Sequence, residues 1–193
     1  MPACTCKNLE SLQQEYQNAA YLEGYMKALA EHLKGVEARQ ADMNAIDPTN
    51  RDAGKSVNQA SAEARDAYKA KNLRLPFPKV AGYTGPDEVS MTPSTCKQPE
   101  RQLAEMEGGS ACAGISDALS AHELAHRDLC LKDGPDKYWS RPPSEIALEE
   151  ARMYKLQAAN LKSELRAVLE GSEVTLQGEW THVYSGQGVE IGF

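Results

Sequence analysis

The stretch LESLQQEYQNAAYLEGYMKALAEHLKGVEARQ, residues 9–40, decides the fold class of the N-terminal part of the chain. Apolar side chains recur in it every three or four residues, the spacing that brings them to one face of an α-helix. We therefore predict one long amphipathic helix from Leu9 to about Gln40, ended by the segment Ile46–Asn50, which contains a proline. The apolar positions are Leu9, Leu12, Tyr16, Ala19, Leu22, Met26, Leu29, Leu33 and Val36.

The alanine-rich segment from about Ser56 to Asn72 predicts a second helix, supported by charge pairs four residues apart. We expect the two helices to pair as an antiparallel hairpin. This hairpin defines an N-terminal helical segment, residues 1–72. Residues 73–193 form a second region, which we expect to share one compact unit with it.

The second region, residues 73–193, combines helical and extended patterns. Four prolines and two glycines exclude a continuous helix between Leu73 and Gln98. Helices are predicted at about Pro99–Glu107, at Ile115–Leu131, and from Pro142 to near Gly171. Short strands are predicted at Lys79–Tyr83, Glu88–Thr92, Glu173–Leu176, Glu179–Tyr184 and Val189–Phe193. The expected fold class is therefore α+β, mainly α-helical.

Composition narrows the classes of partner. The 193-residue chain has a net charge of -7, which disfavours binding to nucleic acid. No stretch approaches the roughly 20 apolar residues that cross a bilayer. The segment Met1–Lys7 lacks the apolar core of a signal peptide. We expect either a cytoplasmic protein or one delivered outside the cytoplasm by a route that needs no such signal.

The chain has five cysteines, and an odd number leaves at least one without an intramolecular partner. Their spacings match no zinc finger. Two interpretations are about equally supported. Either a disulfide forms close to residues 122–126, which indicates an oxidising compartment, or the cysteines are small buried thiols. The cysteines are Cys4, Cys6, Cys96, Cys112 and Cys130.

The chemistry is carried by Ala121-His122-Glu123-Leu124-Ala125-His126, which contains an H-E-x-x-H motif. Residues four apart share a helix face, so His122 and His126 supply two of the three protein ligands of a catalytic zinc ion. Glu123 lies about 100° further around the helix and can act as general base on the zinc-activated water. The alternative is a pair of core histidines on a packing helix.

Three glutamates compete to be the third ligand. Spacing from His126 favours Glu145, whereas helix phase favours Glu150, which lies about 60° from the centre of the apolar stripe. Glu145 and Glu149 lie about 160° from that centre and are predicted to be solvated charges. We predict Glu150 as the ligand; the alternative is that it pairs with a buried cation.

Two further side chains are candidates for the oxyanion. Tyr154 lies one turn after Glu150 and could direct its hydroxyl at the site, or it is an ordinary core tyrosine. His182 could also stabilise the oxyanion, or it is an ordinary exposed histidine, which is the favoured interpretation. His32 is predicted to lie on the surface.

The motif, followed by a helix with Glu150 and Tyr154, resembles the zincin metallopeptidases of the glutamate-ligand type. With Cys130 shortly after the motif, it is most similar to the small metallopeptidase domains that bacteria deploy as toxins or secreted effectors. The resemblance covers about residues 112–165. It implies a zincin-like core, one zinc ion on His122, His126 and Glu150, and Glu123 as general base. Met153 stands where such domains often have alanine, which leaves the alignment of Glu149 and Glu150 open by one residue.

We therefore expect a zinc metallopeptidase that acts on a protein or peptide substrate, in the setting of a secreted toxin or effector. An immunity or inhibitor protein is a further expected partner. Two alternatives remain. One is a zinc amidohydrolase acting on cell-wall peptides, and the other is a non-enzymatic helical interaction module with a structural metal.

Overall fold

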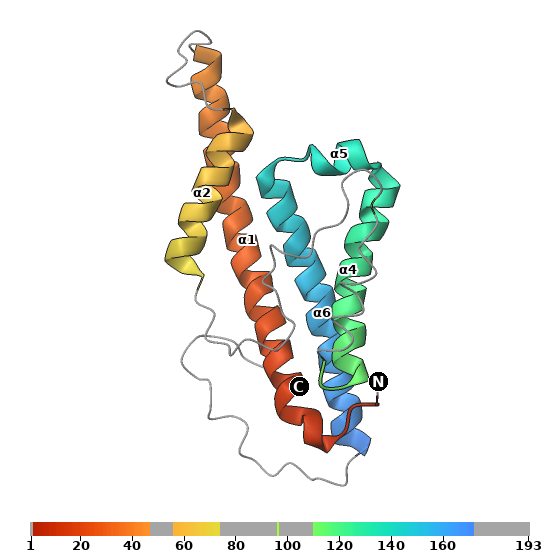
Figure 1. Cartoon of the computed structure of the whole chain (residues 1–193). Helices are drawn as coiled ribbons and strands as arrows, with labels where there is room; N and C mark the ends of the chain where they lie inside the picture. Colours follow the sequence, from red (N-terminus) through yellow and green to blue (C-terminus); the bar gives the residue numbers. More distant parts are fainter. Residues whose placement is uncertain (1, 47–55, 74–95, 97–109, 172–193) are drawn as a thin grey trace.

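A computed structural model describes residues 2–46, 56–73, 96 and 110–171 (Figure 1). Of these residues, 89% are helical, and none belongs to a strand. The elements are η1 (Cys6–Asn8), α1 (Leu9–Ile46), α2 (Val57–Asn72), α4 (Ala113–Asp133), α5 (Pro135–Trp139) and α6 (Pro143–Gly171).

The expected α+β fold with a zincin-like core is wrong for the described part of the chain, which is all-α. The physical reason is that, among the described residues, helix faces and not a sheet bury the helix that carries the motif, because α6 packs along α4. The predicted helix Pro99–Glu107 and the five predicted strands lie outside the described residues. Those strands are Lys79–Tyr83, Glu88–Thr92, Glu173–Leu176, Glu179–Tyr184 and Val189–Phe193.

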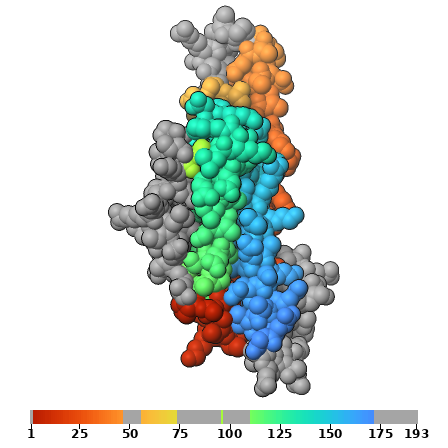
Figure 2. Space-filling view, turned by 90° about the vertical axis from the view of Figure 1, so that its right-hand side faces the viewer, coloured from red at the N-terminus to blue at the C-terminus, as the bar shows by residue number. Residues whose placement is uncertain are grey.

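The centre of the molecule is a bundle in which α6 lies between α1 and α4 (Figure 1). Figure 2 shows α4 and α6 side by side along one face. The core is made of leucines and other apolar side chains from all three helices, and each fully buried leucine is worth about 1.5–3 kcal/mol. Its most buried members include Leu12, Leu29, Leu33, Ile115, Ala118 and Leu161. None of the described helices is long and apolar enough to cross a membrane.

The predicted N-terminal hairpin is confirmed. Ser56 caps α2 by accepting a hydrogen bond from the Gln59 amide, 3.1 Å away. The helix runs antiparallel to α1, because its last residue, Asn72, accepts a 3.4 Å hydrogen bond from the Tyr21 hydroxyl in the N-terminal half of α1. Tyr68, one turn earlier, packs on Tyr25, with ring centroids 5.8 Å apart.

The junction between α4 and α6 contains a one-turn helix that the sequence analysis missed. Gly134 has a φ of 83°, the left-handed region that favours glycine, and it ends α4 while opening α5. Pro135 follows at the first helical position, where its missing N–H costs nothing. The next helix, α6, is capped from α1: the Ser144 amide donates to the Glu37 carboxylate at 2.9 Å.

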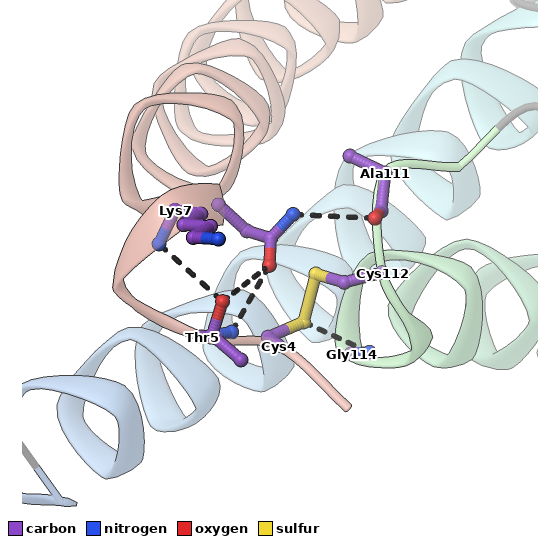
Figure 3. Close-up of a disulfide and its surroundings, with 7 residues drawn as sticks. Cys4, Thr5, Lys7, Ala111, Cys112 and Gly114 are labelled. Atoms are coloured by element: carbon purple, nitrogen blue, oxygen red, sulfur yellow. Dashed lines mark hydrogen bonds between the residues drawn. A yellow bond between two sulfur atoms is a disulfide. The ribbon is translucent and has the colours of Figure 1, made fainter. Parts of the chain in front are cut away.

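Two disulfides tie the ends of α4 to the rest of the chain, so the cysteines at these positions are paired and are not small buried thiols. Cys96–Cys130 lies at the C-terminal end, and Cys4–Cys112 lies at the N-terminal end (Figure 3). Beside Cys4, the Asn8 side chain donates to the backbone carbonyl of Ala111 at 3.2 Å. Cys6 is an exposed free thiol.

The Cys4–Cys112 bond joins residues 108 apart, and closing so long a loop restricts the unfolded chain strongly. We expect Cys4→Ser/Cys112→Ser to lower the free energy of unfolding by about 3–5 kcal/mol. The measurement is denaturant unfolding followed by circular dichroism at 222 nm. The control is Cys6→Ser, an exposed change that should stay within about 0.5 kcal/mol of the natural protein. Equal stability of the two variants would contradict the expectation.

Candidate metal centre

His122 and His126 of α4 and Glu150 of α6 meet at one point. Their ligand atoms all lie within 4.8 Å of one another. The two histidines are 5% and 7% exposed, whereas the Glu150 side chain is 22% exposed. The structure therefore brings together the three predicted ligands, with Glu150 on the side that solvent reaches most easily.

The outer nitrogen of each imidazole is held by α6. His122 Nδ1 lies 3.0 Å from Gln157 Oε1, and His126 Nδ1 lies 2.6 Å from Glu149 Oε1. Amide and carboxylate oxygens accept hydrogen bonds, so each Nδ1 must donate a proton. In the neutral ring this leaves Nε2 with a free lone pair, the form of histidine that binds metals.

The two Nε2 atoms face each other at 3.2 Å. Oxygens of the Glu150 carboxylate lie 3.6 Å from His122 Nε2 and 3.4 Å from His126 Nε2. Two lone pairs and a carboxylate repel one another at these distances unless a proton or a metal cation lies among them. The cluster is thus built for a positive charge.

Without a metal ion, a proton on one imidazole would supply this charge. Burial lowers the pKa of His126, but its hydrogen bond to Glu149 and the nearby Glu150 carboxylate outweigh burial and raise the pKa to about 10. Burial raises the pKa of Glu150, and the two histidines overcome this and lower it to about 2. A metal ion that binds here would displace the proton.

Glu149 is not the solvated charge that was predicted: it is 2% exposed. Its Oε1 also accepts a 2.7 Å hydrogen bond from the Tyr138 hydroxyl, and its Oε2 pairs with the Arg141 guanidinium. Burial raises the pKa of Glu149, but hydrogen bonds from His126, Tyr138 and Arg141 lower it below its usual value. The prediction failed because α6 is covered on two sides, by α1 and by α4, and the apolar stripe marks only part of its buried arc.

The other predicted residues differ in how deeply they are buried. Glu145 is exposed in the first turn of α6 and lies outside the metal group. Tyr154 is 3% exposed, with its ring edge-on to His122 and ring centroids 4.6 Å apart. Glu123 is half-buried on α4. His32 is exposed, as predicted, and stacks near Tyr68. His182 lies outside the described residues.

Sequence reasoning missed three side chains that support the site: Gln157, Tyr138 and Arg141. Gln157 lies seven residues after Glu150, two helical turns along the same face, and this spacing could have revealed it. Tyr138 and Arg141 lie on and just after α5, where no periodic pattern indicates the direction of a side chain.

The chain has no counterpart in the comparisons with known proteins. No family model, curated protein or solved structure matches it. The interpretation of the site therefore depends on its own geometry.

The geometry distinguishes Glu150, which helix phase favoured, from Glu145, which the spacing from His126 favoured. We expect Glu150→Gln, which keeps the size but removes the charge, to weaken Zn²⁺ binding by more than about 100-fold. The matched variant Glu145→Gln, on the same helix, should bind as the natural protein does. Isothermal titration calorimetry at neutral pH measures both. Loss of binding in Glu145→Gln with retention in Glu150→Gln would reverse the assignment.

Proposed function

We propose that this protein is a zinc-dependent hydrolase of amide bonds, with a peptide bond as its substrate. The observation that carries the proposal is the convergence of two Nε2 lone pairs and the Glu150 carboxylate on one point. Two imidazoles and one carboxylate are a ligand set of catalytic zinc sites, which leave a fourth position for water or substrate. The group found among the described residues has three members.

Two residues close to the ligands along the helices would serve hydrolysis. A zinc ion held there would lower the pKa of a water ligand towards about 7 and polarise a carbonyl group. Glu123, next to His122 on α4, would accept the proton of the attacking water and pass it to the departing amine. The Tyr154 hydroxyl would stabilise negative charge on the carbonyl oxygen.

The disulfides bear on the compartment in which the protein acts. Two of them in one domain of this size are typical of proteins in oxidising compartments. This agrees with a secreted toxin or effector whose substrate is a protein or a peptide, and with an inhibitor or immunity protein as partner. Hydrolysis of cell-wall peptides would use the same metal chemistry, so assays should offer both substrate classes.

Glu123 distinguishes a hydrolase from a helical module with a structural metal. We expect Glu123→Gln to reduce peptide hydrolysis by about 10²–10⁴-fold while Zn²⁺ binding and helicity are retained, because only the proton acceptor is lost. Turnover and metal content are measured on the same preparation. The control is Asp128→Asn, an exposed change on the same helix that should keep full activity. Metal binding without turnover in the natural protein, on casein and on wall peptides alike, would favour the structural module.

A substitution at Tyr154 distinguishes a role in stabilising the oxyanion from simple packing. We expect Tyr154→Phe, which keeps the ring that packs on His122, to lower kcat by about 10²-fold with little change in Zn²⁺ affinity. Steady-state kinetics on the zinc-loaded variant measures this. Full activity would make Tyr154 a core residue only.

A further inference from the structure

The Cys96–Cys130 disulfide lies one helical turn from the metal group. Cys130 follows His126 by four residues, so both lie on the same face of α4. Cys96, Cys130 and Tyr138 form a small buried cluster of their own, separate from the main core, and are 1%, 0% and 5% exposed. The ring of Tyr138 therefore packs against the Cys96–Cys130 disulfide.

The other end of Tyr138 reaches the metal group. Its hydroxyl donates to Glu149 Oε1 at 2.7 Å, and the same oxygen accepts the His126 Nδ1 proton at 2.6 Å. The backbone also links Tyr138 to Cys130, since the Cys130 carbonyl accepts from the Gly134 amide and the Gly134 carbonyl accepts from the Tyr138 amide, both at 2.9 Å. A continuous series of contacts thus connects the disulfide to the ring of a metal ligand.

We propose that the Cys96–Cys130 disulfide sets the metal affinity of the site by holding Tyr138 and Glu149 against His126. Tyr138 and Glu149 are positioning residues in this relay, since neither belongs to the group of three ligands. The inference rests on the metal site of the proposed function, and it does not require that the protein hydrolyse anything.

The chemical step is a thiol–disulfide exchange. A dithiol reductant transfers two electrons and two protons to the Cys96–Cys130 bond, which becomes two thiols, and the reductant becomes a disulfide. Without the covalent link, the cluster under Tyr138 loosens, and the hydrogen bonds that orient His126 weaken. Losing such an outer contact of a metal-bound histidine costs about 10–100-fold in affinity. The protein would then bind metal tightly only after it reaches an oxidising compartment.

The Cys4–Cys112 disulfide provides a matched control. Cys112 and Cys130 are 18 positions apart in the sequence, about 27 Å along the helix. Cys112 belongs to the main core, whereas Cys130 belongs to the cluster under Tyr138. Removing Cys4–Cys112 therefore tests the general effect of losing a disulfide, without touching the relay.

The test compares Zn²⁺ affinity in Cys96→Ser/Cys130→Ser and Cys4→Ser/Cys112→Ser, by competition with a chelator at neutral pH, with helicity checked in each. We expect the first pair to weaken binding about 10–100-fold and the second to change it by less than about 3-fold. Tyr138→Phe, with both disulfides intact, should reproduce most of the loss. An unchanged affinity in Cys96→Ser/Cys130→Ser, or an equal loss in both pairs, would overturn the proposal.

A second readout needs no metal. In the metal-free protein, NMR of the histidine side chains follows the exchange of each Nδ1 proton with water. Cys96→Ser/Cys130→Ser should speed exchange at His126 and leave His122, held by Gln157, unchanged. Equal behaviour of the two protons would overturn the relay. Absence of Zn²⁺ binding in the intact protein would instead overturn the proposed function, and the NMR result would still decide whether the disulfide orients His126.

Discussion

The packing of α6 against α4 is the contact on which the site depends. The helix α4 contributes the two histidines, and α6 contributes four of the side chains that surround them: Gln157, Glu149, Glu150 and Tyr154. Because Glu149 and Glu150 are neighbours in one helix, a single placement of α6 sets both the outer hydrogen bond of His126 and the carboxylate that faces its inner nitrogen. A sliding of α6 by one turn would destroy both together.

The same contact places two acidic groups in a poorly hydrated region, where an unpaired charge is costly. Glu149 is compensated by the Arg141 guanidinium and by hydrogen bonds from Tyr138 and His126. Glu150 faces the two imidazoles, which compensate it only if a proton or a metal ion accompanies them. The division of labour between the two carboxylates, one orienting and one ligating, follows from these different neighbours.

Much of this could be predicted from sequence, for reasons that are local. Apolar spacing located α1, alanine content and charge pairs located α2, and helix start and stop signals located α4 and α6. The phase of α6 selected Glu150 over Glu145. The burial of Glu149 could not be predicted, because it depends on the position of Tyr138 and Arg141 around α5, a tertiary arrangement. The α+β expectation failed for a related reason: the H-E-x-x-H pattern specifies a helix, but it does not specify what that helix packs against.

In the proposed site, His122, His126 and Glu150 hold one metal ion through nitrogen and oxygen atoms. The most direct test is X-ray absorption spectroscopy at the zinc edge of the zinc-loaded protein. We expect about four nitrogen or oxygen neighbours of the zinc ion at roughly 2.0–2.2 Å, with the outer-shell scattering of two imidazoles. Sulfur neighbours at about 2.3 Å, or scattering without imidazole, would contradict it.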